Sequence, residues 1–197
     1  AFTCVMRKAA LLGTAVAGLS ALASPALAHP GHSFGFVPGL LHPLTGADHL
    51  LAMLAVGLWS GFVLPNRFWA GAATFLTGMV AGAALAWFGV AVPLVEETIL
   101  LSVLAFGLMV GLSRRGQSLA LTLATGVMIA VFAAAHGYAH ATEATGAVAL
   151  YLTGFLASTT ALHLAGIGIA RRVAGAGLVQ GLIGAGIAGA GLLMMAG

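Results

Sequence analysis

Six long apolar stretches constrain the fold of this chain more than any other feature, because a helix needs about 20 apolar residues to cross a bilayer. Short connections separate the stretches and carry nearly all of the charged residues. The chain is 61% hydrophobic and only 6% charged, whereas soluble domains carry roughly 25% charged residues. We therefore predict an all-α integral membrane protein, a compact bundle of six transmembrane helices at about residues 42–64, 68–91, 95–113, 117–137, 145–170 and 174–196.

The segment before these stretches has the pattern of a cleavable secretory signal peptide. A basic start at Met6–Lys8 precedes an apolar core, and a small-residue cleavage pattern ends at Ala28. We predict that residues 1–28 comprise an upstream remnant and a signal peptide, and that residues 29–197 form one six-helix transmembrane domain. An uncleaved first helix is the alternative, since the residues around the cleavage pattern are also apolar.

The charges of the connections predict how the bundle is oriented. Removal of a signal peptide leaves the new N-terminus outside, so the first, third and fifth connections lie in the cytoplasm. These three hold every basic residue after the signal, and the other connections hold only glutamates, as the positive-inside rule requires. We expect a bacterial inner (cytoplasmic) membrane protein with both mature termini on the periplasmic side. The basic residues are Arg67, Arg114, Arg115, Arg171 and Arg172.

Composition excludes two other classes of site. The pI is about 9.8, but it rests on 7 Lys and Arg against 4 Asp and Glu. These few basic residues are scattered, so no nucleic-acid partner is expected. The single cysteine, Cys4, precedes the signal peptide, so any metal ion must be held by nitrogen and oxygen ligands.

Small residues at four-residue spacing predict tight helix packing. The packing could occur within one bundle or between the copies of a homo-oligomer, and the sequence leaves both open. The pattern comprises Gly78 with Gly82, Gly107 with Gly111, and a ridge of Gly177, Gly181, Ala185 and Gly189 in the last span.

The first span opens with an unusual polar cluster, "HPLTGADH". A carboxylate or an imidazole is costly inside a membrane, so such a cluster usually has a function. Pro43 suits the first position of a helix, and His42 or Thr45 would then cap it. We expect Asp48 and His49 one to two turns further on; if the helix starts early, His42 and His49 lie on one stripe of it.

A second histidine cluster marks the end of the fourth span. His136 and His140 are four residues apart, which puts two imidazoles on one helix face, and Glu143 continues that face. The same spacing occurs in metal-chelating helices. A pair that merely lies at the membrane interface is the alternative interpretation.

Three further histidines lie outside these clusters. His163 is deep in the fifth span, where it is a metal ligand or a hydrogen-bonded packing element, and Thr159 or Thr160 could hold its other ring nitrogen. His29 and His32 flank the first span beside the predicted cleavage site, where they could capture a metal ion.

Imidazole and carboxylate ligands without thiolate select divalent ions such as Ni²⁺, Co²⁺ and Zn²⁺, and Cu²⁺ is also compatible. We see no phosphate-binding loop, so an electrochemical gradient is expected to drive any transport; a cation gains roughly 2.3 kcal/mol per charge per 100 mV.

Two other classes of function stay open. One is a membrane hydrolase in which Zn²⁺ activates water and Asp48 or Glu143 is the general base. The other is a sensor or accessory protein that binds metal without transporting it.

These motifs resemble those of the HupE/UreJ family of nickel and cobalt permeases, over essentially the whole length after the signal. The first-span motif HPxxGxDH is matched in full by His42, Pro43, Gly46, Asp48 and His49. The later motifs are matched by His136, Gly137, Ala139, His140 and Glu143, and by "LHLAGI" at 162–167. Some members have a histidine where this chain has Tyr138 and a glycine where it has Ala141, so the number of ligands stays open.

The resemblance implies a permease and not an enzyme, with no catalytic residues and no catalytic cofactor. Its partners would be the lipid bilayer and its cargo, Ni²⁺ or Co²⁺ with Zn²⁺ also compatible, taken up to supply hydrogenase or urease maturation. A metal binds only neutral imidazole or ionised carboxylate, so acidification should weaken uptake. The expected metal ligands are His42, Asp48, His49, His136, His140 and, as a later station, His163; His29 and His32 would recruit the ion and Glu143 would line the entrance.

Overall fold

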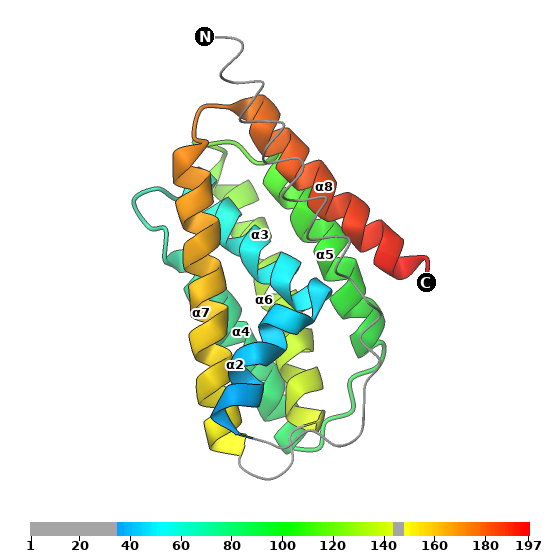
Figure 1. Ribbon diagram of the computed structural model, residues 1–197. Coiled ribbons are helices and arrows are strands. Elements are labelled where there is room, and N and C mark those ends of the chain that lie inside the picture. Colours follow the sequence, from blue (N-terminus) through cyan, green and yellow to red (C-terminus); the bar gives the residue numbers. More distant parts are fainter. Residues whose placement is uncertain (1–34, 144–147) are drawn as a thin grey trace.

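The structure is a computed structural model that describes residues 35–143 and 148–197. The predicted signal peptide, His29 and His32 lie outside the described residues, and so does the side chain of Glu143. All secondary structure in the described part is helical (Figure 1). The helices are α2 (Phe36–Thr45), α3 (Ala47–Val63), α4 (Ala70–Trp87), α5 (Val95–Leu112), α6 (Leu119–Glu143), α7 (Val148–Arg172) and α8 (Gly177–Met195).

Five of the described helices, α4 to α8, are each long and apolar enough to cross a membrane. Helices α2 and α3 meet that criterion only together, and they are bent by 80° at the break between them. The prediction of an all-α membrane bundle is therefore confirmed, with five continuous spans. A sixth span exists only if the bent pair is counted as one.

The predicted continuous first helix at 42–64 is wrong. Helix α2 already begins at Phe36, and the chain breaks at Gly46, whose backbone is extended (φ −86°, ψ 116°). Pro43 lies inside α2 instead of starting a helix, and a proline inside a helix removes a backbone hydrogen bond and disfavours continuation. No side chain caps α3; Thr45 donates its hydroxyl back to the carbonyl of His42 at 3.1 Å.

Helix α4 packs on α6 through the predicted glycine pair. A Cβ atom on Gly78 would lie 2.6 Å from the carbonyl oxygen of Ala130, and one on Gly82 would overlap the backbone of Ala134. Only glycine allows the two backbones to approach this closely. The tight packing predicted from this pair is confirmed.

Helix α5 packs on α8, but not through the ridge that the spacing predicts. A Cβ atom on Gly177, Gly181 or Gly189 would meet no described atom within 4 Å. The backbone of α5 instead approaches Gly184 and Gly191. The predicted ridge therefore faces away from α5, because the four-residue pattern occurs on two faces of this glycine-rich helix.

Gln180 joins α8 to the C-terminal end of α5. Its side-chain amide donates to the carbonyl oxygens of Val110 and Ser113, at 2.8 Å each, where a helix has carbonyls without intrahelical partners. Each such bond contributes about 1 kcal/mol net. We expect Gln180→Leu to lower the thermal unfolding midpoint in detergent by a few degrees, and by more than Gln117→Leu, because Gln117 bonds only to its near neighbours Arg114 and Thr122, at 3.2 and 3.4 Å, in and beside the α5–α6 connection. Equal midpoints for both variants would contradict this account.

The two ends of the bundle differ in charge. Figure 1 shows the connections 64–69, 113–118 and 173–176 at one end of the bundle and the connection 88–94 at the other. Every basic side chain in the described residues lies in or beside the first three connections, and all of these side chains are exposed: Arg67, Arg114, Arg115, Arg171 and Arg172.

Candidate metal centre

The break between α2 and α3 brings His42 and His49 together. His42 lies in the last turn of α2 and His49 in the first turn of α3, and their ring centroids are 5.4 Å apart. The sequence predicts them on one stripe of a continuous helix. They meet instead across an 80° bend, so the contact depends on Gly46 and not on helical periodicity.

Helix α6 supplies the third imidazole, His140. This helix continues to Glu143, past the predicted end at 137, so His140 projects from regular helix. Its Nε2 lies 2.6 Å from Nε2 of His49, and its ring centroid lies 4.7 Å from that of His42. One potential ligand nitrogen from each of these three histidines lies within 4.8 Å of the others. We refer to His42, His49 and His140 as the three-histidine group.

The other three predicted ligands are placed differently. Asp48 lies beside the group, with its Oδ1 2.9 Å from Nδ1 of His49. His136 lies one helical turn before His140, with its ring centroid 5.0 Å from that of His49. His163, on α7, lies apart from the group and contacts the ring of Phe75, at 5.3 Å between centroids. The structure thus brings three of the six predicted ligands together, with two more adjacent to them.

Hydrogen bonds determine which ring nitrogen of His136 and of His163 is available to bind a metal ion. The Nδ1–H of His136 donates to the carbonyl of Phe132 at 2.8 Å, and that of His163 donates to the carbonyl of Thr159 at 2.7 Å. A carbonyl can only accept, so in the neutral rings Nε2 carries the lone pair. Thr159 thus holds His163 through its backbone, whereas Thr160 donates its hydroxyl to Leu156.

The available nitrogens are buried. Nε2 of His136, Nε2 of His163 and Nδ1 of His140 have no hydrogen-bond partner among the described residues. A buried polar atom without a partner is costly and needs an explanation. Lone pairs on buried imidazoles are suitable ligands for a divalent cation.

Aromatic side chains of α7 that the motifs do not include cover the group. Phe155 is 1% exposed, and its ring centroid lies 4.6 Å from that of His140. Tyr151 lies one turn earlier, 6.0 Å from the ring of His42. Their four-residue spacing puts both on one face of α7, a signal that sequence reasoning could have used.

Tyr138, the position that left the number of ligands open, points to a different part of the molecule. Its hydroxyl accepts a hydrogen bond from the backbone N–H of Val92 at 3.4 Å. It therefore joins α6 to the α4–α5 connection and lies outside the three-histidine group.

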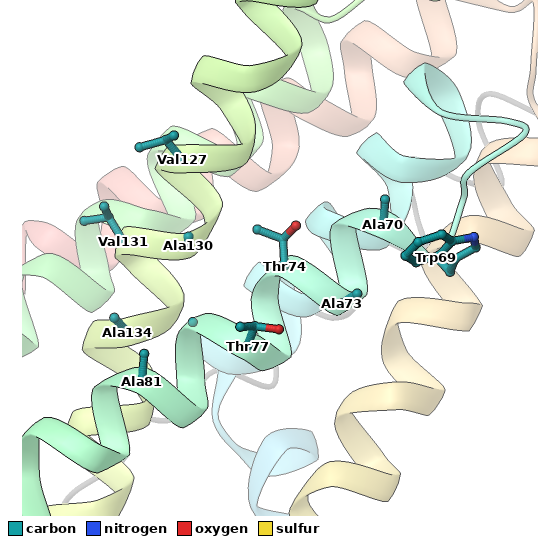
Figure 2. A pocket seen from close by; sticks show the side chains of 11 residues that line it. Trp69, Ala70, Ala73, Thr74, Thr77, Ala81, Val127, Ala130, Val131 and Ala134 are labelled. Carbon is teal, nitrogen blue, oxygen red and sulfur yellow. The ribbon is translucent and has the colours of Figure 1, made fainter.

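An open surface groove of about 640 Å³ lies elsewhere, between α4 and α6. Figure 2 shows small and apolar side chains around it, with two threonines on α4. None of its lining residues is a histidine or a carboxylate, so it offers no metal ligands. The lining residues are Trp69, Ala70, Ala73, Thr74, Thr77, Gly78, Ala81, Val127, Ala130, Val131 and Ala134.

A bundle of apolar spans that buries a group of imidazoles has the character of a membrane protein that binds a divalent metal ion. The profile of the family described as "HupE / UreJ protein" matches residues 16–194. Protein HupE of Rhizobium leguminosarum bv. viciae is 37% identical over 189 residues, which cover 89% of this chain and 95% of that protein. No solved structure matches the chain.

The chain therefore belongs to the HupE/UreJ family, a family of nickel and cobalt transporters. Membership supports a role in metal transport generally, and it fits the several membrane spans and the three-histidine group.

Proposed function

We propose that the protein takes up Ni²⁺, with Co²⁺ as a second cargo, across the bacterial inner membrane, and that a gradient drives the ion. The uptake supplies the maturation of a hydrogenase or urease. The convergence of three imidazoles from α2, α3 and α6 carries the proposal, because their ligand nitrogens lie within 4.8 Å of one another. Nitrogen ligands without thiolate suit these ions.

The ion binds between the two facing Nε2 atoms, with His42 as the third ligand. His49 and His140 hold these nitrogens 2.6 Å apart. Metal–nitrogen distances of about 2.0–2.1 Å in a tetrahedral site put two ligand nitrogens roughly 3.3 Å apart. The two Nε2 atoms therefore need to move apart by only about 0.7 Å to admit the ion.

The orientation follows from charge. The end that carries all described basic side chains faces the cytoplasm in this proposal, and the mature termini are external. The three-histidine group then lies towards the external half of α6. His29 and His32 recruit the ion outside, Glu143 lines the entrance, and His163 is a later station.

Asp48 acts through His49 in this proposal. Its carboxylate fixes the His49 tautomer so that Nε2 faces the ion, and it offsets part of the cation's charge. Loss of a side chain that hydrogen-bonds a metal ligand typically costs about 10- to 100-fold in metal affinity.

We expect Asp48→Asn to weaken Ni²⁺ binding within that range, measured by isothermal titration calorimetry. The matched control is Glu96→Gln, which removes an exposed carboxylate from the first turn of α5 and leaves affinity unchanged. Wild-type affinity in Asp48→Asn would exclude this role.

Transport itself is tested with purified protein in liposomes that contain a nickel-sensitive dye. An inside-negative potential should drive saturable Ni²⁺ entry in the wild type. Tight binding of Ni²⁺ without entry would overturn the proposal and favour a membrane metalloenzyme or a metal sensor.

A further inference from the structure

One aromatic side chain contacts both His163 and His136, the histidine beside the three-histidine group. Phe75 of α4 is fully buried. Its ring centroid is 5.7 Å from that of His136 and 5.3 Å from that of His163. Helices α6 and α7 thus each bring one imidazole to the phenyl ring that α4 carries.

The two imidazoles are equivalent in their bonding. Each donates Nδ1–H to the carbonyl four residues earlier, and each has a buried Nε2 without a partner in the described part of the chain. Both are therefore prepared to accept a cation at Nε2. His136 adjoins the three-histidine group through His49, whereas His163 has its ring contact with Phe75.

We propose that the Phe75 ring is the barrier between the outer histidines and His163, so that an ion passes from His136 to His163 only when this ring moves aside. The inference rests on the proposed transport function and adds a residue that controls its rate. The phenyl ring packs against both imidazoles and offers no lone pair. A dication that entered this space would lose ligands without gaining any.

Removal of the ring should open a polar passage. A cavity that is lined by polar groups and large enough holds water, whereas an apolar one stays dry. The space left by Phe75→Ala would adjoin His136 and His163, so water and a hydrated ion could enter it. Phe75 has no ring contact with the three-histidine group in the described residues, so the affinity of the outer site should persist.

The experiment compares Ni²⁺ entry into liposomes for the wild type, Phe75→Ala, Phe75→Leu and Phe75→Trp, with equal amounts of protein and saturating Ni²⁺. We expect entry to be several-fold faster in Phe75→Ala, moderately faster in Phe75→Leu, and slower in Phe75→Trp. The dissociation constant for Ni²⁺, measured in detergent, stays at its wild-type value in all three. If the alanine variant fails to fold, the leucine and tryptophan variants decide the matter by their opposite effects.

Phe106→Ala is the matched control. Phe106 is equally buried, but its ring packs edge-on against Phe132, at 5.4 Å between centroids. The space left by Phe106→Ala has the same size but lies beside Phe132, so the rate of Ni²⁺ entry should be unchanged. Faster entry in Phe106→Ala to the same degree, or wild-type entry rates in the folded Phe75 variants, would overturn the barrier. Absence of entry in the wild type would instead overturn the transport function itself.

Discussion

Replacing His49 by alanine is expected to weaken Ni²⁺ binding by more than roughly 100-fold. His49 faces His140 through Nε2 and Asp48 through Nδ1, so the variant removes one proposed ligand and separates the carboxylate from the site. Two imidazoles then remain in the three-histidine group. The loss of Ni²⁺ affinity should exceed the roughly 10- to 100-fold that is typical when a side chain that hydrogen-bonds a metal ligand is removed. Isothermal titration calorimetry of the purified protein measures it.

His163→Ala is the matched control for this prediction. His163 is buried even more deeply than His49, but it lies apart from the three-histidine group. We expect this variant to retain the wild-type dissociation constant and to slow entry into liposomes. Unchanged Ni²⁺ affinity in His49→Ala would show that the ion binds elsewhere.

Replacing Gly137 by alanine is expected to disrupt the pairing of α4 and α6. A Cβ atom at this position would overlap the backbone of Met79, and a backbone cannot rotate away as a side chain can. Overpacking of this kind costs about 1–3 kcal/mol, and more where the structure cannot relax. Because Gly137 lies between His136 and His140, the variant should lose both thermal stability in detergent and Ni²⁺ binding.

Gly126→Ala tests whether alanine as such is tolerated in α6. A Cβ atom there meets no described atom within 4 Å, and alanine is favoured over glycine in a helix by about 1 kcal/mol. We expect its unfolding midpoint to equal or exceed that of the wild type. A Gly137→Ala protein as stable as Gly126→Ala would contradict the close approach of α4 and α6.

The membrane bundle could be predicted because it follows from local features of the sequence. Apolar length defines each span, and short charged connections separate the spans, so α4 to α8 fall close to their predicted ranges. The break at Gly46 could not be predicted in the same way. Pro43 is compatible with either the start or the interior of a helix, and the contact of α2 with α7 selects the interior.

The candidate site was predictable in its residue types but not in its grouping. Spacing alone pairs His136 with His140, and His42 with His49. Which of these imidazoles share one ion depends on where the packing of α6 on α4 and α5 places its end relative to the α2–α3 bend. This placement brings His140 against His49 and leaves His163 apart. Phe75 and Phe155 were missed because aromatic residues in an apolar span look like ordinary core.

X-ray absorption spectroscopy at the nickel edge tests the central claim most directly, because it reports the ligands of the bound ion. The nickel-loaded wild type is predicted to show at least three imidazole ligands, as the three-histidine group supplies, and the His140→Ala protein to show one fewer. A spectrum made up of oxygen ligands, or one that is identical in the two proteins, would contradict the assignment of this group as the metal centre.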